Sequence, residues 1–370
     1  MDLKQHLKTL VEQHGPSGFE APVGRVIQEA WSPLVDSLEI GKSGSLIALK
    51  RGTQTDSSDG TRRRIMLCAH MDEIGMIVRE VRGTFLKVSR LGGIDARILP
   101  GLPILVHGRE PVPGLIGIVP QPTLSSENQG VYAALDDLYV DLCLPPERVA
   151  ALVRVGDPIT VDLPMIELGN GLLVGKAMDD RACVAAITVC LEQLQSRKHE
   201  WDVLAVAAVQ EETGSRGAAV EAYHLQPDIA IALDVTYGQQ PGVSGADVHK
   251  LGGNPPLSLG ANFHPALFEA IKAASERLEL TLPIDPLPGH SGTDAWVIQT
   301  AREGIPSALL NIPIRNMHTA IETVDLKDIE RAGRVLTEFI TGLKPDFLSA
   351  IQWDKAPSEK DSQEGEKKDE

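Results

Sequence analysis

The stretch VLAVAAVQEETGSRGA, residues 203–218, sets the question that the rest of the sequence has to answer. Its first residues, 203–209, are all apolar, which is typical of a strand buried on both faces of a sheet. Glu211 and Glu212 stand side by side where this run ends. Because a strand directs neighbouring side chains to opposite faces, the two glutamates either have different partners or lie where the strand has begun to turn.

The chain after residue 175 alternates between strand-like and helix-like segments. We predict strands over residues 203–210, 229–235 and 307–311. Helical segments separate and follow them, at residues 179–195, 216–223, 265–278, 294–299 and 326–343. Such alternation predicts an α/β fold, in which helices cover a sheet.

Residues 75–164 have a different pattern, with short β-type runs separated by Gly and Pro at intervals of about 8–12 residues. The runs are 75–81, 85–88, 104–106, 115–119, 138–142 and 158–161. This pattern is typical of a small barrel or sandwich. We therefore predict an α/β domain built from residues 1–73 and 166–350, interrupted by an all-β insertion at residues 74–165.

The composition excludes several classes of protein. The formal net charge is −16 over 370 residues, which argues against a nucleic-acid partner. No run approaches the about 18 apolar residues of a membrane span, and the N-terminus lacks the apolar core of a secretory signal. The four cysteines are scattered rather than spaced as a disulfide framework, so we expect a cytoplasmic protein. Residues 354–370 contain no large apolar side chain and are predicted to form a disordered, charged tail.

Histidine and carboxylate side chains recur at the ends of the apolar runs. Each has an ordinary explanation by itself, such as a hydrogen-bonded core histidine or a helix N-cap. His70 and Asp72 are two residues apart, so both point to one face of a strand. The full set is His70, Asp72, Asp179, Asp180, Glu211, Glu212, Asp234 and His318.

The set as a whole points to a metal site. The ends of the strands converge on one crevice, where so many carboxylates would repel one another unless cations were bound. Mixed histidine and carboxylate ligands without thiolates suit Zn²⁺, with Co²⁺ or Mn²⁺ as alternatives. A site with two metals needs a bridging carboxylate and a spare carboxylate as base. One glutamate of the pair can therefore bind metal while its neighbour acts as general base.

Seven segments resemble the tetrahedral (TET-type) aminopeptidases, also known as deblocking or glutamyl aminopeptidases, some of which are labelled endoglucanases. These segments are GPSGFE (15–20), AHMDEIG (69–75), GKAMDDRA (175–182), VQEETGSRGA (209–218), ALDVT (232–236), SGTDA (291–295) and NMHTAIETVD (316–325). The resemblance implies a zinc-peptidase α/β domain with an inserted β-barrel that helps the chain to dimerise. It also implies dodecameric tetrahedra with an internal chamber, and peptides as substrates.

The resemblance further implies a role for each site residue. Asp179 would bridge two metals, and the bond that follows it would be cis. Glu212 and His318 would complete the coordination of one metal, and His70 and Asp234 would complete that of the other. Glu211 would act on a water that bridges the metals, as general base and acid, and Asp72 would orient His70. The implied reaction is the removal of N-terminal residues from peptides.

The sequence departs from the family pattern at two positions. Cys183 replaces the usual Gly, and Asn316 replaces a common Tyr. We interpret Cys183, like Cys68, as a core residue rather than a ligand. Asp294 either lies near the substrate or caps the helix that follows it. Two other functions stay open, a metal-independent glycosidase with two carboxylates and a non-catalytic, metal-stabilised assembly that binds peptides.

Overall fold

The computed structural model describes residues 1–54, 62–120 and 132–351, and the predicted disordered tail, residues 354–370, lies outside the described residues. The helices are α1 (Leu3–Glu12), α2 (Ala21–Trp31), α3 (Pro146–Leu152), α4 (Met178–Gln193), α5 (Arg216–Leu225), α6 (Pro265–Arg277), α7 (Asp294–Gln299) and α8 (Leu326–Gly342). Within the described residues, none of them is both long and apolar enough to cross a lipid bilayer.

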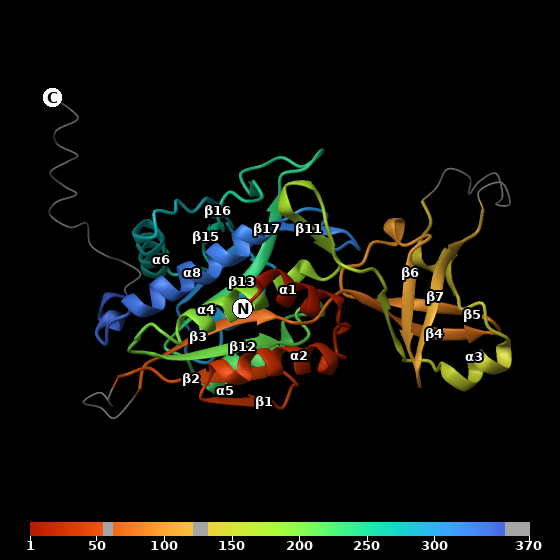
Figure 1. The fold of residues 1–370 in the computed structure, drawn as a ribbon, viewed down its shortest axis with the longest axis horizontal. Coiled ribbons are helices and arrows are strands. Elements are labelled where there is room, and N and C mark those ends of the chain that lie inside the picture. Colours follow the sequence, from red (N-terminus) through yellow and green to blue (C-terminus); the bar gives the residue numbers. More distant parts are fainter. Residues whose placement is uncertain (55–61, 121–131, 352–370) are drawn as a thin grey trace.

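A mixed sheet forms the centre of the larger part of the molecule (Figure 1). Its strands follow the order β1 (Ser37–Ile40), β2 (Leu46–Lys50), β12 (Asp202–Ala208), β3 (Arg64–His70), β13 (Ile229–Gly238), β17 (Ser307–Ile314), β15 (Leu257–Leu259) and β16 (Ile284–Pro286), with β14 (Val248–His249) paired to β13. The central strands β12, β3, β13 and β17 are parallel, so their carboxyl ends meet at one edge.

Helices cover both faces of this sheet. Successive side chains of a strand point to opposite faces, so alternate residues of the same strand contact different helices. On β3, Ile65 and Leu67 join a core formed with α1, α2, α4, α6 and α8. Met66 and Cys68 join a second core, formed with α5 and α7 on the opposite face. A strand buried on both faces does not alternate between polar and apolar residues, which explains the continuous apolar runs in the sequence.

The predicted β-insertion forms a closed barrel at one end of the molecule, on the right in Figure 1. Its strands are β4 (Gly75–Arg82), β5 (Phe85–Leu91), β6 (Pro103–His107), β7 (Pro111–Ile118), β8 (Leu138–Asp141) and β9 (Pro158–Val161). Residues that point inward from all of these strands form a separate hydrophobic core. The structure thus confirms the predicted fold class, a mixed sheet flanked by helices with an all-β barrel.

A small antiparallel sheet lies beside the carboxyl edge of the large one. It consists of β10 (Ile166–Glu167), β11 (Leu172–Gly175) and β18 (Glu322–Asp325). Gly175 at the end of β11 pairs with Glu322 at the start of β18. This pairing brings the segment before Asp179 next to the segment that contains His318.

Candidate active site

The histidine and carboxylate residues predicted from the sequence come together at the carboxyl edge of the sheet. His70 is the last residue of β3, and it is level with Ala208, the last residue of β12. Asp234 lies within the adjacent strand β13, which continues beyond the predicted end at residue 235 to Gly238. His70 and Asp234 are both buried.

Asp179 lies between the two histidines. Its Oδ1 is 3.0 Å from Nε2 of His70, and its Oδ2 is 3.2 Å from Nε2 of His318. Asp179 and Asp180 have non-helical dihedral angles at the start of α4, and the peptide bond that joins them is cis. Neither residue is the N-cap of the helix, which is Ala177. The ordinary explanation of this aspartate pair as a helix cap is therefore wrong.

The two adjacent glutamates lie on a turn rather than on a strand, so the predicted strand over residues 203–210 is too long. Strand β12 ends at Ala208, and Gln210 has a φ of 57°, a left-handed conformation that breaks the strand. The carbonyl of Glu211 then accepts hydrogen bonds from the N–H groups of Gly214 and Ser215. Both of the explanations left open by the sequence hold, because the glutamates also have different partners.

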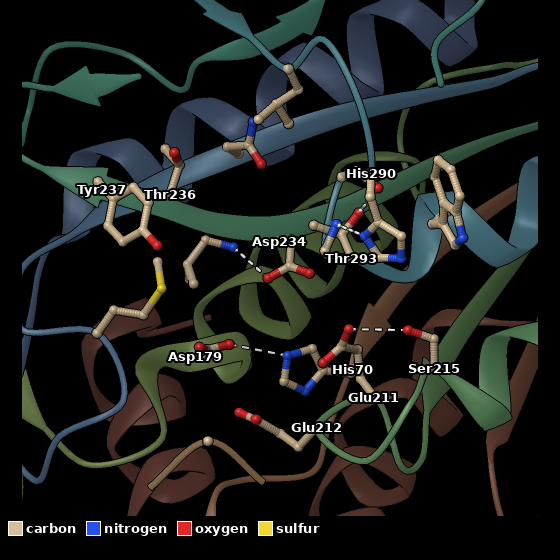
Figure 2. Close-up of a pocket in the computed structure, with 18 of the residues that line it drawn as sticks. His70, Asp179, Glu211, Glu212, Ser215, Asp234, Thr236, Tyr237, His290 and Thr293 are labelled. Atoms are coloured by element: carbon tan, nitrogen blue, oxygen red, sulfur yellow. Dashed lines mark hydrogen bonds and ion pairs between the residues drawn. The ribbon is translucent and has the colours of Figure 1, made fainter. Parts of the chain in front are cut away.

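Those partners differ in kind. The carboxylate of Glu211 accepts a hydrogen bond of 3.1 Å from the Ser215 hydroxyl. Oε1 of Glu212 lies 3.4 Å from Nε2 of His318. Figure 2 shows the Glu211 side chain directed toward Ser215, with Glu212 on the side nearer to Asp179.

Asp72 links the two glutamates to His70. Its carboxylate oxygens accept hydrogen bonds from the backbone N–H groups of Glu211 (3.0 Å) and Glu212 (3.2 Å). Nδ1 of His70 lies 3.2 Å from the carbonyl oxygen of Asp72 and 3.4 Å from its Oδ1. The Asp72 side chain is fully buried. It therefore fixes the ends of β3 and β12 relative to each other.

The sequence assigns no role to two further residues of this cluster, Asp180, which it only groups with the others, and Glu322, which it does not single out. Asp180 accepts a hydrogen bond from the His70 N–H, and its Oδ1 has no hydrogen-bond partner in the described part of the chain. Glu322 accepts hydrogen bonds from the backbone N–H groups of Asp179 and His318. Both lie inside quoted motifs, Asp180 next to Asp179 and Glu322 four residues after His318, but nothing in a motif shows which way a side chain points.

The pKa values show how strongly these charges depend on one another. Burial and, to a smaller extent, the charge of Asp179 raise the pKa of Glu212 to about 8. Burial also raises the pKa values of Glu211 and Asp234. The hydrogen bond from His318 to Asp179 raises the pKa of the histidine to about 9. The cluster thus holds more negative charge than its buried position favours, and a bound cation would relieve the repulsion.

The donor set fits a divalent metal. Ligand atoms of His70, Asp179 and Glu212 lie within 4.8 Å of one another, and so do those of His70, Asp180 and Asp234. Imidazole nitrogens and carboxylate oxygens, without thiolates, suit Zn²⁺ and similar ions. The unpartnered Oδ1 of Asp180 and the carboxylate of Asp179 between two imidazoles are both typical of groups that bind a cation.

A cavity of about 560 Å³ opens directly onto this cluster (Figure 2). His70, Asp179, Glu211, Glu212, Asp234 and His318 line one side of it. Other parts of the wall come from β13, from the segment before α7 and the start of that helix, from Asp247 and Asp285, and from Gly93 in the barrel. A second cavity of about 550 Å³ shares Tyr237, Asp247 and His318 with the first. The site is therefore accessible to a molecule larger than water.

The remaining sequence predictions concern residues behind the site. Cys68 and Cys183 are fully buried in the two cores, as expected of core residues. Asp294 does not cap α7, because the side chain of Thr293 accepts the hydrogen bond from the Ala295 N–H. Asp294 is instead buried behind the cavity wall, where the Cys68 thiol donates to its Oδ2 at 3.5 Å. Asn316 bonds through its side chain to the carbonyl oxygen of Ile321.

Comparison with known proteins gives matches along most of the chain. The sequence model of the M42 glutamyl aminopeptidases matches residues 44–335. A lysyl aminopeptidase of Pyrococcus furiosus is 31% identical over 347 residues, which cover 92% of this chain and 97% of that protein.

Solved structures agree with this result. A TET aminopeptidase from a marine sediment archaeon of the Thaumarchaeota superimposes with a TM-score of 0.88 at 29% identity, covering 95% of this chain and 99% of that one. The TET1 peptidase of Pyrococcus horikoshii, which can assemble into a tetrahedron or a large octahedral shell, superimposes with a TM-score of 0.80 at 27% identity. This match covers 92% of this chain and 100% of that one. Since the match extends through the barrel and the helix-covered sheet alike, this chain belongs to the M42 glutamyl aminopeptidase family and is a hydrolase of peptide bonds.

Proposed function

We propose that this protein is a two-metal aminopeptidase that removes N-terminal residues from peptides, with Glu211 as the general base. The observation that carries the proposal is the position of the Asp179 carboxylate, whose two oxygens face His70 and His318. A carboxylate in this position can be shared by two metal ions. Glu211 lies beside the cluster, and Ser215 donates a hydrogen bond to its carboxylate.

In this proposal, Asp179 would be a ligand of both ions. Glu212 and His318 would complete the coordination of one ion, and His70 and Asp234 that of the other. Zn²⁺ is the proposed metal, with Co²⁺ or Mn²⁺ as alternatives, because the donors are imidazole and carboxylate. Two bound ions would polarise the scissile carbonyl group and lower the pKa of the attacking water.

The side chains of the protein perform the proton transfers. Glu211 accepts the proton of the attacking water and then donates it to the leaving amine. Burial raises the pKa of Glu211 above its ordinary value, which makes the carboxylate a stronger base than an exposed glutamate. Asp72 orients His70 and holds the backbone of both glutamates. We assign it to positioning rather than to the proton transfer itself.

The alternative functions account for fewer of these groups. A metal-independent glycosidase needs two carboxylates and leaves His70 and His318 without a role. A binding protein needs no base beside its metal ligands, so Glu211 would have no role there. Membership of a peptidase family also favours peptide substrates over sugars.

We further propose that the chain associates with itself through the barrel, residues 74–165, into dimers and then a dodecamer. Support comes from the TET1 peptidase of Pyrococcus horikoshii, which forms closed shells. A closed shell would admit peptides and exclude folded proteins. Light scattering coupled to size-exclusion chromatography tests this assembly, and a monomer at all concentrations would contradict it.

The test of the reaction is hydrolysis of a panel of aminoacyl-p-nitroanilides. We expect chelation to abolish the release of p-nitroaniline, and Zn²⁺, Co²⁺ or Mn²⁺ to restore it. Glu211→Gln should still bind metal but lose activity by a factor of about 10²–10⁴, the usual contribution of a general base. Ser215→Ala is the matched control, because it removes the hydrogen bond to Glu211 and leaves the carboxylate in place.

Two results would count against the proposal. Activity that resists both chelation and Glu211→Gln would exclude the two-metal mechanism. Metal binding without hydrolysis of any aminoacyl or peptide substrate would favour the non-catalytic assembly.

A further inference from the structure

Glu322 holds two of the proposed metal ligands in place through their backbones. It is the first residue of β18, and only 1% of its surface is exposed. Oε2 accepts the N–H of Asp179 at 3.1 Å, and Oε1 accepts the N–H of His318 at 2.8 Å. Each oxygen of one carboxylate thus fixes a different ligand-bearing segment.

Both segments have backbone conformations that need external support. His318 has a φ of 60°, and Ala177, two residues before Asp179, has a φ of 55°. Side-chain-bearing residues adopt this left-handed region at a cost in free energy, and they keep it where surrounding contacts determine it. The hydrogen bonds to Glu322 are contacts of this kind.

The position of Glu322 follows from the small sheet. Gly175 pairs with Glu322 across β11 and β18, so the side chain projects beside the chain that leads into α4. In the described part of the chain, Glu322 forms no ion pair within 4 Å. Lys176 lies near enough to interact with its charge, but the ammonium group of this lysine pairs with Glu73 at 2.7 Å. The two oxygens of Glu322 instead accept the backbone N–H groups of Asp179 and His318.

Asp72 has the same arrangement on the other side of the cluster. Its two oxygens accept the N–H groups of Glu211 and Glu212. Together, Asp72 and Glu322 hold the backbones of the proposed base and of three proposed ligands. We propose that Glu322 is a positioning residue, which sets the distance between Asp179 and His318 and thereby the affinity of the site for metal. This inference rests on the proposed two-metal function.

The test measures metal affinity directly, by competition between the protein and a zinc-chelating dye. Glu322→Gln leaves one acceptor and turns the other into an N–H₂ group that faces a backbone donor. Glu322→Asp keeps the charge but shortens the side chain by one methylene. We expect both variants to bind Zn²⁺ about 10–100-fold more weakly, which is the usual effect of losing an outer hydrogen bond to a ligand. Raising the Zn²⁺ concentration should restore part of their kcat.

Asp328 provides a matched control. It is also fully buried, and its carboxylate accepts the N–H groups of Gly252 (2.6 Å) and Asn254 (3.2 Å), but it lies on α8 and does not line the cavity. Asp328→Asn should lower the melting temperature about as much as Glu322→Gln and leave Zn²⁺ affinity unchanged.

Each outcome decides the inference. Weaker binding in both Glu322 variants, with normal binding in Asp328→Asn, supports it. Wild-type Zn²⁺ affinity in Glu322→Asp would show that only the charge of the side chain matters. Equal losses of Zn²⁺ affinity in Glu322→Gln and Asp328→Asn would show a general effect of destabilisation. Either result overturns the positioning role. So does failure of both Glu322 variants to fold while Asp328→Asn folds. A wild-type protein that binds no metal would instead remove the proposed function itself.

Discussion

Gly93 lacks a side chain at a point where one would collide with the site. A Cβ atom there would lie 2.6 Å from Nδ1 of His318, closer than any real contact of this kind. The next atom of the imidazole, Cε1, would lie 2.8 Å away. The ring would have to move, because the glycine backbone belongs to the segment that leads from β5 to the rest of the barrel. The absence of a side chain therefore leaves room for His318.

We expect Gly93→Ala to lower kcat/KM by about 100-fold, the order of loss that follows from a displacement of about 1 Å in a catalytic group. The melting temperature should change little, since the imidazole can rotate into the cavity. Gly169→Ala is the control, because a Cβ at Gly169 would meet nothing within 4 Å. Equal kinetics in the two variants would contradict the assignment of His318 to the site.

At the scale of single residues, the sequence could predict the chemistry of the site but not all of its members. His70, Asp179 and Asp234 could be identified because carboxyl ends of parallel strands converge and apolar runs stop there. Glu322 could not, because its function depends on which backbone groups it faces, and one of them, the N–H of Asp179, is 143 residues away along the chain. Hydrogen bonds to backbone groups leave no pattern of residue types in a sequence.

Among the elements, α4 and α8 pack closely at Gly333. A Cβ at this glycine would lie 2.6 Å from Cβ of Val189 and 2.7 Å from the carbonyl oxygen of Ala186. Overpacking of this kind costs about 1–3 kcal/mol, and the carbonyl oxygen cannot move aside as a side chain could. The better helix propensity of Ala over Gly returns at most about 1 kcal/mol.

Gly333→Ala should therefore lower the free energy of unfolding, measured by urea denaturation. Val189→Ala in the same chain should recover part of that loss, since it removes Cγ1 of Val189, which the new Cβ would meet at 2.6 Å, although Cβ of residue 189 and the carbonyl oxygen of Ala186 stay in place. The double-mutant cycle gives the interaction directly. A Gly333→Ala variant as stable as the wild type would show that the two helices can separate without cost.

Helix α1 contributes a pH dependence to the stability of the fold. Nε2 of His6 lies 3.1 Å from the Thr188 hydroxyl on α4, which also accepts a hydrogen bond from the indole of Trp31. Burial lowers the pKa of His6 from 6.5 to about 4. The unfolded chain therefore binds more protons than the folded chain between these two values, and the free energy of unfolding decreases as the pH falls through this window.

This prediction is tested by urea denaturation across that window in the wild type and in His6→Gln. The variant cannot take up the proton, so its stability should depend less steeply on pH. Parallel pH profiles for the two proteins would exclude His6 as the cause.

The sequence predicted the elements well where periodicity was strong. Each of the six short runs between residues 75 and 161 corresponds to a barrel strand, although β7 begins at Pro111, four residues before the predicted run, and contains Pro113 and Gly114. Errors occur at the ends of elements. The predicted strand at 203–210 stops early at Ala208, since Gln210 adopts a left-handed conformation that no residue type announces. The strand predicted at 307–311 continues to Ile314 through Pro313.

For the whole molecule, the charge of the cavity predicts which peptides are preferred. Within the part of the chain that the structure describes, no lysine or arginine lines the cavity beside the histidine and carboxylate cluster. Asp247 and Asp285 line it in addition to the proposed ligands. Asp285 is already held by His249 and Asn311, whereas Asp247 forms no ion pair with any described residue. An N-terminal residue with a negative side chain would meet unfavourable charge there.

We therefore expect kcat/KM for lysyl substrates to exceed that for norleucyl substrates of similar length, and glutamyl substrates to be the poorest. Because exposed charges are screened by salt, the difference should shrink as ionic strength increases. Asp247→Asn should reduce the preference for lysine without changing the rate on norleucine. A preference for glutamyl substrates would contradict this interpretation of the cavity.

The barrel and the helix-covered sheet could each be foreseen from the sequence, but their contact at the site could not. Only Met71–Ile74 separate the end of β3 from the start of β4, and Asp72 lies within that link. The barrel also returns Gly93 to the wall that contains His318. The insertion therefore enters the chain inside the active site rather than at a distant surface loop. Under the proposed assembly, in which the barrel makes the subunit contacts, an evolutionary exchange of one barrel for another would alter the wall of the active-site cavity at the same time as it altered the oligomer, so subunit contacts and substrate selection could not evolve independently.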